Sequence, residues 1–281
     1  MCYNSLLKGG AIMYSFMNKL FSDKEDGMIF ECFGIWHWIY LLFFTAITVF
    51  SVYYLKNKDS HTRKKFTNIF INVVFCLYVA DFFLMPFALG EIDIDKLPFH
   101  SCTAMCVMCF MSNHNGFLSK YRTNFAMLGF LSNMMYIVYP SGVASYETHP
   151  FSYRAAQTLL FHGFMVVYGL LVIIFNEEGL NIRKCHRDLV ILLSLTCWAL
   201  IGNGLYSGEL GGYSHSFNWF FIRQDPFDLF PSDIAPYITP IVNIIAFFSL
   251  EIIIYLCYSY FKEIADSKKS VAQDAEKKVY I

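Results

Sequence analysis

The sequence predicts an all-α protein, a polytopic membrane helix bundle with about seven transmembrane helices, the N-terminus outside and the C-terminus in the cytoplasm. The first observation behind this prediction is composition: 56% of the 281 residues are hydrophobic and 15% are charged, whereas soluble domains carry about 25% charged residues. The second is that the apolar residues form continuous runs of about 20, the length that crosses a bilayer as a helix. Such runs do not fit the short alternating strands of a membrane barrel.

The chain divides into seven such runs, which are separated by segments with turn residues or charges. The fourth run is the least apolar, because it contains Arg122, Asn124, Ser132 and Asn133, so six or eight spans are the alternatives. The predicted spans are Trp36–Leu55, Phe66–Leu89, Leu97–Leu118, Tyr121–Val143, Ala155–Phe175, Leu189–Tyr206 and Asp233–Phe261.

The basic residues predict the orientation, because the cytoplasmic loops of membrane proteins are enriched in Lys and Arg. With the N-terminus outside, 15 of the 21 Lys and Arg residues fall on the cytoplasmic side. We expect residues 1–35 to form an interfacial or flexible segment, residues 36–261 the seven-helix domain, and residues 262–281 a charged cytoplasmic tail. The cell membrane is the expected location.

Composition also argues against several classes of function. A net charge of −1 offers no basic surface for nucleic acid, so membrane lipids are the expected partners. The nine cysteines are scattered, and most lie in apolar runs, where a thiol behaves as a small hydrophobe, so a disulfide scaffold is not expected. We expect no cofactor, because no nucleotide-binding motif is found. The first 35 residues lack the pattern of a signal peptide, and either Met1 or Met13 is the start. The oligomeric state stays open.

Polar side chains inside the spans point to function, because a charge at the centre of a membrane costs about 2.5–3.5 kcal/mol on insertion scales. With a rise of about 1.5 Å per residue, Asp81 lies about 12 Å below the outer surface, and His162 and Cys106 lie at a similar depth. Glu251 lies near the inner end of the last span, where we expect its carboxylate to reach water. The intramembrane polar groups therefore gather in the outer half, with His100, Cys102 and Asn203 nearest the surface.

Each of these residues also has a purely structural interpretation. Asp81 has a purely structural role if its carboxyl group pairs with an Asn or a Tyr hydroxyl of a neighbouring helix. His162 has one if its ring is hydrogen-bonded to another helix. Asn203, flanked by two glycines, is more typical of helix association or of a local break. Asn218 belongs to an aromatic outer loop, which is typical of the membrane interface.

Three cysteines form one stripe on the third predicted span, because Cys102, Cys106 and Cys109 are spaced i, i+4, i+7. His100 falls on roughly the opposite face, so the four ligands of a thiolate metal site do not close on one point. We therefore expect no metal. A nucleophilic pair stays open, in which Cys102 or Cys106 is activated by His162 from another helix.

Short motifs follow the order and spacing of a known family from about residue 30 to residue 262. They are Leu97-Pro98-Phe99-His100-Ser101-Cys102, Phe161-His162-Gly163, Asn218-Trp219, Asp225-Pro226 and Pro236-Tyr237. In these motifs the chain resembles the YwaF-type bacterial integral membrane protein family, which is similar to the animal transmembrane protein 164 group. The resemblance implies a multi-span protein and, from the animal group, acyl transfer onto lysophospholipids through a Cys and a His. His100 and His162 match the family histidines, whereas Phe99 stands where the animal pattern has its cysteine.

The resulting hypothesis is a lipid acyltransferase with its site in the outer half of the membrane. In this hypothesis His162 takes a proton from Cys102 or from a lysolipid hydroxyl. His100 or Asn218 donates a hydrogen bond to the oxyanion, and Asp81 orients a histidine. The alternative is a small transporter or ligand-binding protein that uses the same polar cavity. A third interpretation is a scaffold for other membrane proteins.

Overall fold

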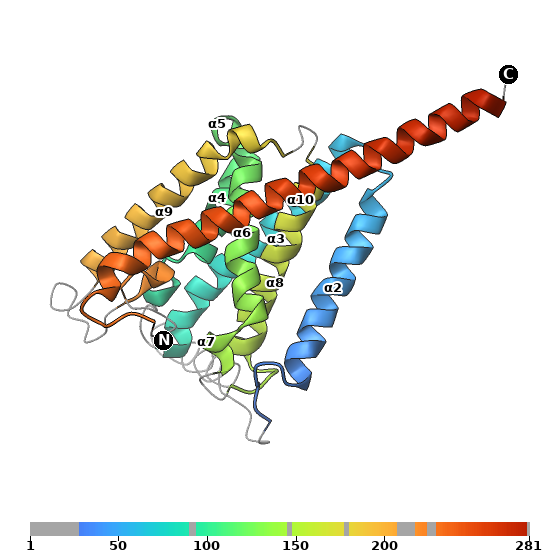
Figure 1. The fold of residues 1–281 in the computed structure, drawn as a ribbon. Coiled ribbons are helices and arrows are strands. Elements are labelled where there is room, and N and C mark those ends of the chain that lie inside the picture. The colour runs from blue at the N-terminus through green and yellow to red at the C-terminus, as the bar shows by residue number, and fades with distance from the viewer. Residues whose placement is uncertain are drawn as a thin grey trace.

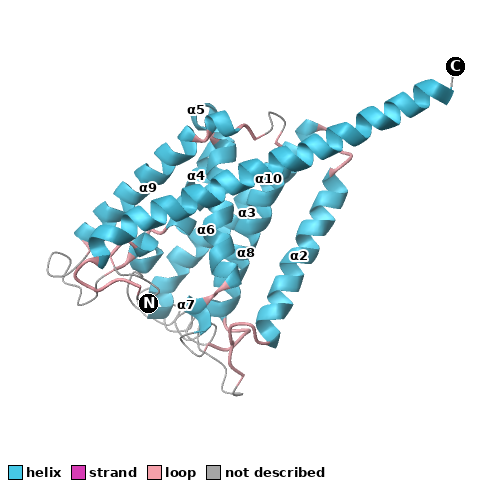
Figure 2. Ribbon diagram, viewed as in Figure 1, coloured by secondary structure: helices cyan, strands magenta, loops and turns pink. Residues whose placement is uncertain are grey.

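Helices make up all the regular secondary structure in the described part of the chain (Figures 1 and 2). The computed structural model describes residues 28–89, 94–144, 148–176, 180–206, 217–223 and 229–279, so most of the expected N-terminal segment 1–35 lies outside the described residues. The longer helices are α2 (Ile35–Leu55), α3 (Ser60–Leu89), α4 (Ser101–His114), α6 (Arg122–Val138), α8 (Tyr153–Ile174), α9 (His186–Leu205) and α10 (Ala235–Val279). The short ones are η1 (Ile94–Lys96), α5 (Gly116–Ser119), α7 (Ser141–Ala144), η2 (Ile182–Lys184) and η4 (Trp219–Phe221).

Five helical segments within the described ranges are long and apolar enough to cross a membrane. They correspond to the first, second, fifth, sixth and seventh predicted spans. The all-helical class is therefore confirmed, and the apolar helices support an integral membrane protein. The five segments are Ile35–Leu55, Ser60–Leu84, Tyr153–Ile174, Ile182–Leu205 and Ala235–Ile264.

The third and fourth predicted spans are shorter helices. α4 has 14 residues and α6 has 17, which correspond to about 21 and 26 Å at about 1.5 Å per residue, less than the roughly 30 Å of hydrocarbon in a bilayer. α4 ends where Asn115 leaves helical geometry, and the Asn115 side chain accepts hydrogen bonds from the backbone N–H groups of Phe117 and Leu118 to begin α5. Length and composition alone therefore do not establish these two spans.

α6 lies in the interior of the bundle, and its polar residues belong to that interior. It packs against α4, α8, α9 and α10, and ten of its 17 residues are buried. Among the buried residues are Asn124, Ser132 and Asn133, the same side chains that lower its hydropathy. By contrast, only four of the 21 residues of α2 are buried. The polar residues of the fourth predicted span are thus interior contacts.

The basic loops lie together at one end of the bundle (Figure 1). Arg63 at the start of α3 donates to the carbonyl of Leu55 at the end of α2, and its guanidinium lies 4.8 Å above the ring of Phe175 at the end of α8. Arg122 at the start of α6 donates to the Thr67 hydroxyl of α3. α10 continues to Val279 and projects past the bundle (Figure 1), so the predicted tail after residue 261 continues this helix.

Gly202 of α9 provides a test of the packing. It lies against the ring of Phe99, which packs on the rings of Trp198 and Trp219. A Cβ at position 202 would overlap the Phe99 ring, and overpacking a filled core costs about 1–3 kcal/mol. We expect Gly202→Ala to lower the thermal unfolding temperature of the purified protein. Gly204→Ala is the matched control, because a Cβ there meets open space. Equal unfolding temperatures for the two variants would contradict this packing.

Candidate functional site

His162 of α8 is held in the interior by two residues of α6. Its Nδ1 lies 2.7 Å from Asn133 Oδ1. Its ring stacks on the ring of Tyr136, with centroids 3.9 Å apart and an interplanar angle of 14°. Asn133 and Tyr136 are three residues apart and therefore share one face of α6. Because both His162 and Asn133 are buried, this contact fixes the imidazole inside the bundle.

The hydrogen bonds of Asn133 determine which nitrogen of His162 carries the hydrogen. Asn133 Nδ2 donates to the carbonyl of Gly129 at 2.7 Å, so the amide oxygen faces His162 and only accepts. His162 Nδ1 must therefore carry the hydrogen, and Nε2 of the neutral ring has the lone pair. A ring in this state accepts a proton at Nε2, which is the property of a general base.

His100 is in the complementary state. It is the residue immediately before α4, and its Nδ1 accepts a hydrogen bond from the backbone N–H of Phe220 at 3.4 Å. A backbone N–H only donates, so Nδ1 of His100 has the lone pair and Nε2 of the neutral ring carries the hydrogen. In the neutral rings, His100 therefore donates a hydrogen bond at Nε2, whereas His162 accepts one at Nε2.

The segment η4 that contacts His100 has a strained backbone. Phe220 and Phe221 adopt positive φ angles of 60° and 52°, a conformation that costs of order 1–3 kcal/mol per residue. Asn203 of α9 exchanges two hydrogen bonds with the backbone of Trp219, at 3.0 and 2.9 Å. Asn243 of α10 donates to the carbonyl of Phe220 at 2.8 Å. Side-chain amides of two helices thus stabilise a backbone conformation that these aromatic residues disfavour.

Trp219 adds an unpaired donor to this region. Its side chain is fully buried, and its ring lies 4.8 Å from that of Phe99 and 4.5 Å from that of Phe217, centroid to centroid. The indole N–H is buried and has no acceptor among the residues that the structure describes. Buried Trp N–H groups usually find a partner, so this unpaired donor is unusual.

Asp81 of α3 is paired with a lysine. Its Oδ2 lies 2.8 Å from Lys96 Nζ of η1, and the Tyr153 hydroxyl also hydrogen-bonds to the Asp81 side chain. The Tyr78 hydroxyl donates to the carbonyl of Lys96 at 2.8 Å, so two contacts attach η1 to α3. Asp81 thus has the tyrosine partner that its structural interpretation predicts. An amide of α6, and not Asp81, orients His162.

The cysteines of the α4 stripe differ in accessibility. Cys106 and Cys109 are fully buried, whereas Cys102 is only partly buried. Cys102 and Cys106 both lie within electrostatic reach of the Tyr78 hydroxyl. Within the described ranges, no three His, Cys, Asp or Glu side chains form a group suited to a metal ion. Cys102 is therefore the more accessible candidate nucleophile.

These groups form one polar layer at the end of the bundle opposite the basic loops. His162 lies within electrostatic reach of His100 and Lys96. The Tyr78 ring lies 6.1 Å from that of Phe161, the neighbour of His162. The structure thus brings residues of α3, η1, α4, α6 and α8 to one region. η4 borders it through the bond from Phe220 to His100, and α9 holds η4 through Asn203.

Asn218, the remaining residue predicted for the site, shapes the loop next to η4. Its Oδ1 accepts a hydrogen bond from the backbone N–H of Arg223 at 2.8 Å. This contact and the Asn203 clamp on Trp219 hold both ends of the described segment 217–223. The structure therefore gives both asparagines a role in positioning backbone near His100.

A comparison with known protein families matches residues 32–260, which include the whole polar layer, to the TMEM164 family. The chain belongs to the TMEM164 family. This finding confirms the relationship to the animal transmembrane protein 164 group that the motifs indicate. Searches of curated proteins and of solved structures gave no match.

Several residues of the polar layer in this TMEM164-family chain carry little signal in the sequence. Asn133 stands out only as a polar residue that weakens the fourth predicted span. Its spacing on that helix, four residues after Gly129 and three before Tyr136, is the one pattern that points to a shared face. Lys96 lies between two predicted spans and Tyr153 just before another, so neither is marked as intramembrane.

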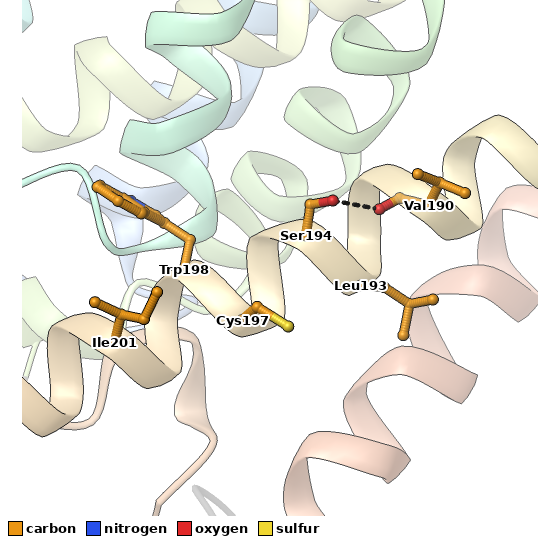
Figure 3. A pocket seen from close by; sticks show the side chains of 6 residues that line it. All are labelled: Val190, Leu193, Ser194, Cys197, Trp198 and Ile201. Atoms are coloured by element: carbon orange, nitrogen blue, oxygen red, sulfur yellow. Dashed lines mark hydrogen bonds between the residues drawn. The ribbon is translucent and has the colours of Figure 1, made fainter.

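The TMEM164-family chain also has a shallow apolar hollow of about 420 Å³ on the outward face of α9 (Figure 3). The Ser194 hydroxyl in it donates to the carbonyl of Val190 and is satisfied within the helix. The Trp198 indole donates to the carbonyl of Pro98 at 2.7 Å. The hollow thus has the character of a helix face exposed to lipid, and we assign no chemistry to it. It is lined by Val190, Leu193, Ser194, Cys197, Trp198 and Ile201.

The two ring states can be measured by nitrogen NMR of isotope-labelled histidine in the purified protein. We expect His162 as the Nδ1–H form and His100 as the Nε2–H form, because Asn133 accepts from one ring and Phe220 donates to the other. Asn133→Leu should remove the preference of His162. Ser112→Ala is the control, since this buried hydroxyl bonds only within its own helix. The same form for both rings would contradict the assignment.

Proposed function

We propose that this multi-pass membrane protein is an acyltransferase that moves a fatty acyl chain between phospholipids at a His/Cys site in the outer half of the membrane. The observation that carries the proposal is the complementary state of two histidines, one an acceptor and one a donor at Nε2. Membership of the TMEM164 family supports it, because the resemblance to the animal group implies acyl transfer.

In the first step, Cys102 attacks the ester carbonyl carbon of a donor phospholipid. His162 takes the thiol proton at Nε2, the S–C bond forms, and the oxyanion accepts a hydrogen bond from His100 Nε2. The ester C–O bond then breaks. The proton on His162 passes to the departing lysophospholipid oxygen, which leaves an acyl thioester on Cys102.

In the second step, a lysophospholipid hydroxyl attacks the thioester carbon. The hydroxyl proton passes to His162 as the new C–O bond forms, and the C–S bond breaks to release the acylated lipid. The Cys102 thiolate then takes the proton back. Asn133 keeps its hydrogen bond to Nδ1 throughout, so it orients the ring and stabilises the imidazolium, as the asparagine of a Cys–His–Asn arrangement does.

Cys102 suits the role of nucleophile better than Cys106, because it is partly exposed and Cys106 is fully buried. Direct attack by a lysolipid hydroxyl, with His162 as the base and no cysteine, is the alternative. The transporter alternative uses Asp81 of the same outer-half cavity as its proton or ligand contact, and this acid is paired with Lys96.

We also propose that α4 and α6 complete a seven-span bundle in the cell membrane, with the N-terminus outside and the C-terminus in the cytoplasm. α4 and α6 run between the same two ends of the bundle as their neighbours (Figure 1). The basic loops and the projecting part of α10 share one end, and basic loops favour the cytoplasmic side. This orientation places the polar layer in the outer half, where membrane lipids are the expected substrates and partners.

Lipid profiling of cells that express the variants tests the acyl transfer. We expect His162→Ala to lower transfer by about 100-fold or more, because it removes the general base. Cys102→Ser should abolish labelling by an acyl probe, while Cys106→Ser should retain it. The matched control is His114→Ala, since His114 is exposed and bonds to Asn72 at the basic end. An unchanged acyl-chain distribution in His162→Ala would overturn the proposal, and full transfer by Cys102→Ser would favour direct attack.

Reporter fusions test the orientation. Green fluorescent protein fused after Ile281 should fluoresce, because the C-terminus is expected in the cytoplasm, whereas alkaline phosphatase at the same position should be inactive. The reverse behaviour is expected for fusions in the loop between α6 and α8. Active phosphatase at the C-terminus would refute the orientation.

A further inference from the structure

A second buried polar cluster lies toward the basic end of the bundle, away from His100 and His162. Asp188 in the first turn of α9 and Glu251 of α10 are both 0% exposed. The expectation that Glu251 reaches water is therefore wrong, because α10 packs this part of its surface against α6 and α9. The exposure of Glu251 is determined by the face of α10 on which it lies, and not by its depth along the helix.

Asp188 has a hydrogen-bond donor for each oxygen. The side-chain amide of Asn124 on α6 donates to Oδ1 at 2.6 Å. The hydroxyl of Tyr255 on α10 donates to Oδ2 at 2.7 Å. Hydrogen bonds to an ionised acceptor are stronger than those between neutral groups, so this arrangement favours the carboxylate form of Asp188.

Glu251 has no such donor. Both of its carboxyl oxygens are buried without a hydrogen-bond partner in the part of the chain that the structure describes. Glu251 precedes Tyr255 by four residues, so the two side chains share the face of α10 that meets Asp188. The charges of Asp188 and Glu251 also lie within electrostatic reach of each other.

An ionised Glu251 is disfavoured for two reasons, the apolar surroundings and the neighbouring anion. Protonation removes both penalties without moving the side chain. We propose that Asp188 and Glu251 form a proton-binding site in the inner half of the bundle, in which Glu251 carries the proton at neutral pH and Asp188 carries the charge. The site is separate from the acyl-transfer chemistry and does not depend on it.

Other titratable groups surround the pair. His186 of α9 lies within electrostatic reach of Asp188, and Cys185 at the end of η2 lies within reach of Tyr255. α6 contributes the uncharged amide of Asn124. Among the described residues, none of these groups donates a hydrogen bond to Glu251, so the proton is what neutralises this carboxyl.

The proton controls how α10 packs against α6 and α9. When Glu251 loses it, two anions occupy the same interior and only Asp188 has donors. The folded form therefore binds this proton more tightly than the unfolded chain, and the stability that it provides is lost as the pH rises.

A hydrophobic carbodiimide tests for the proton, because it reacts with protonated carboxyl groups. The acid O–H adds across one C=N bond, oxygen to carbon and hydrogen to nitrogen, and an O-to-N acyl shift leaves a stable N-acylurea. In the full-length protein in lipid bilayers at neutral pH, peptide mass spectrometry should find the adduct on Glu251. Glu263 of the same helix is exposed and serves as the internal control that stays largely unlabelled. Glu251→Gln should lose the adduct.

One further variant and the pH dependence of stability test the pairing. Asp188→Asn removes the neighbouring anion, so the pH at which Glu251 labelling is half lost should fall. The thermal unfolding temperature should decrease with rising pH in the wild type and much less in Glu251→Gln. Absence of the adduct at neutral pH would overturn the proposal. Protection from labelling by Na⁺ or K⁺ at constant pH would overturn it in favour of a bound cation.

Discussion

A polar side chain inside this bundle must find its partner on another segment of the protein, because neither lipid nor an apolar core can hydrogen-bond to it. The contact between His162 and Asn133 depends most directly on this constraint. It requires α6 and α8 to approach closely, and Gly169 permits this, since a Cβ there would meet the backbone of Ala126 and the side chain of Phe130. Small residues allow such close approach in membrane helices. The orientation of the imidazole is thus a consequence of helix packing.

The same constraint explains where the sequence predicts the fold and where it does not. α2, α3, α8, α9 and α10 are evident in the sequence as continuous apolar runs. α8 is the most buried of these five and is still strongly apolar, whereas the buried Asn124 and Asn133 lower the hydropathy of α6. Hydropathy therefore reflects whether the buried contacts of a helix are apolar or polar, and it does not report burial itself.

The residues of the candidate site also fall into two groups, those that the sequence identifies and those that it does not. The cost of burying charge identifies Asp81 and His162 from the sequence, since few residues of their type occur in apolar runs. Their partners, Lys96 and Asn133, come from segments distant in the chain. Partner identity is a property of tertiary packing, so the sequence predicts which groups need a partner and not which residues supply it.

Asp81 and Glu251 show that the surroundings of a buried acid depend on which charged group lies next to it. Both are acids in apolar helices and both are buried. Asp81 lies 2.8 Å from an ammonium group, so its charge is balanced where it stands. Glu251 meets an anion that already has its own donors. Two acids that look alike in the sequence therefore have opposite electrostatic surroundings.

α6 links the two polar clusters without making them one unit. Asn124 and Asn133 are nine residues apart, about 14 Å along the helix at about 1.5 Å per residue. Asn124 donates to Asp188, and Asn133 accepts from His162, so α6 carries one contact to each cluster. α10 packs against α6 and also reaches the polar layer through the bond from Asn243 to the carbonyl of Phe220. Two routes therefore connect the clusters, one along α6 to the base at His162 and one through η4 to the donor at His100.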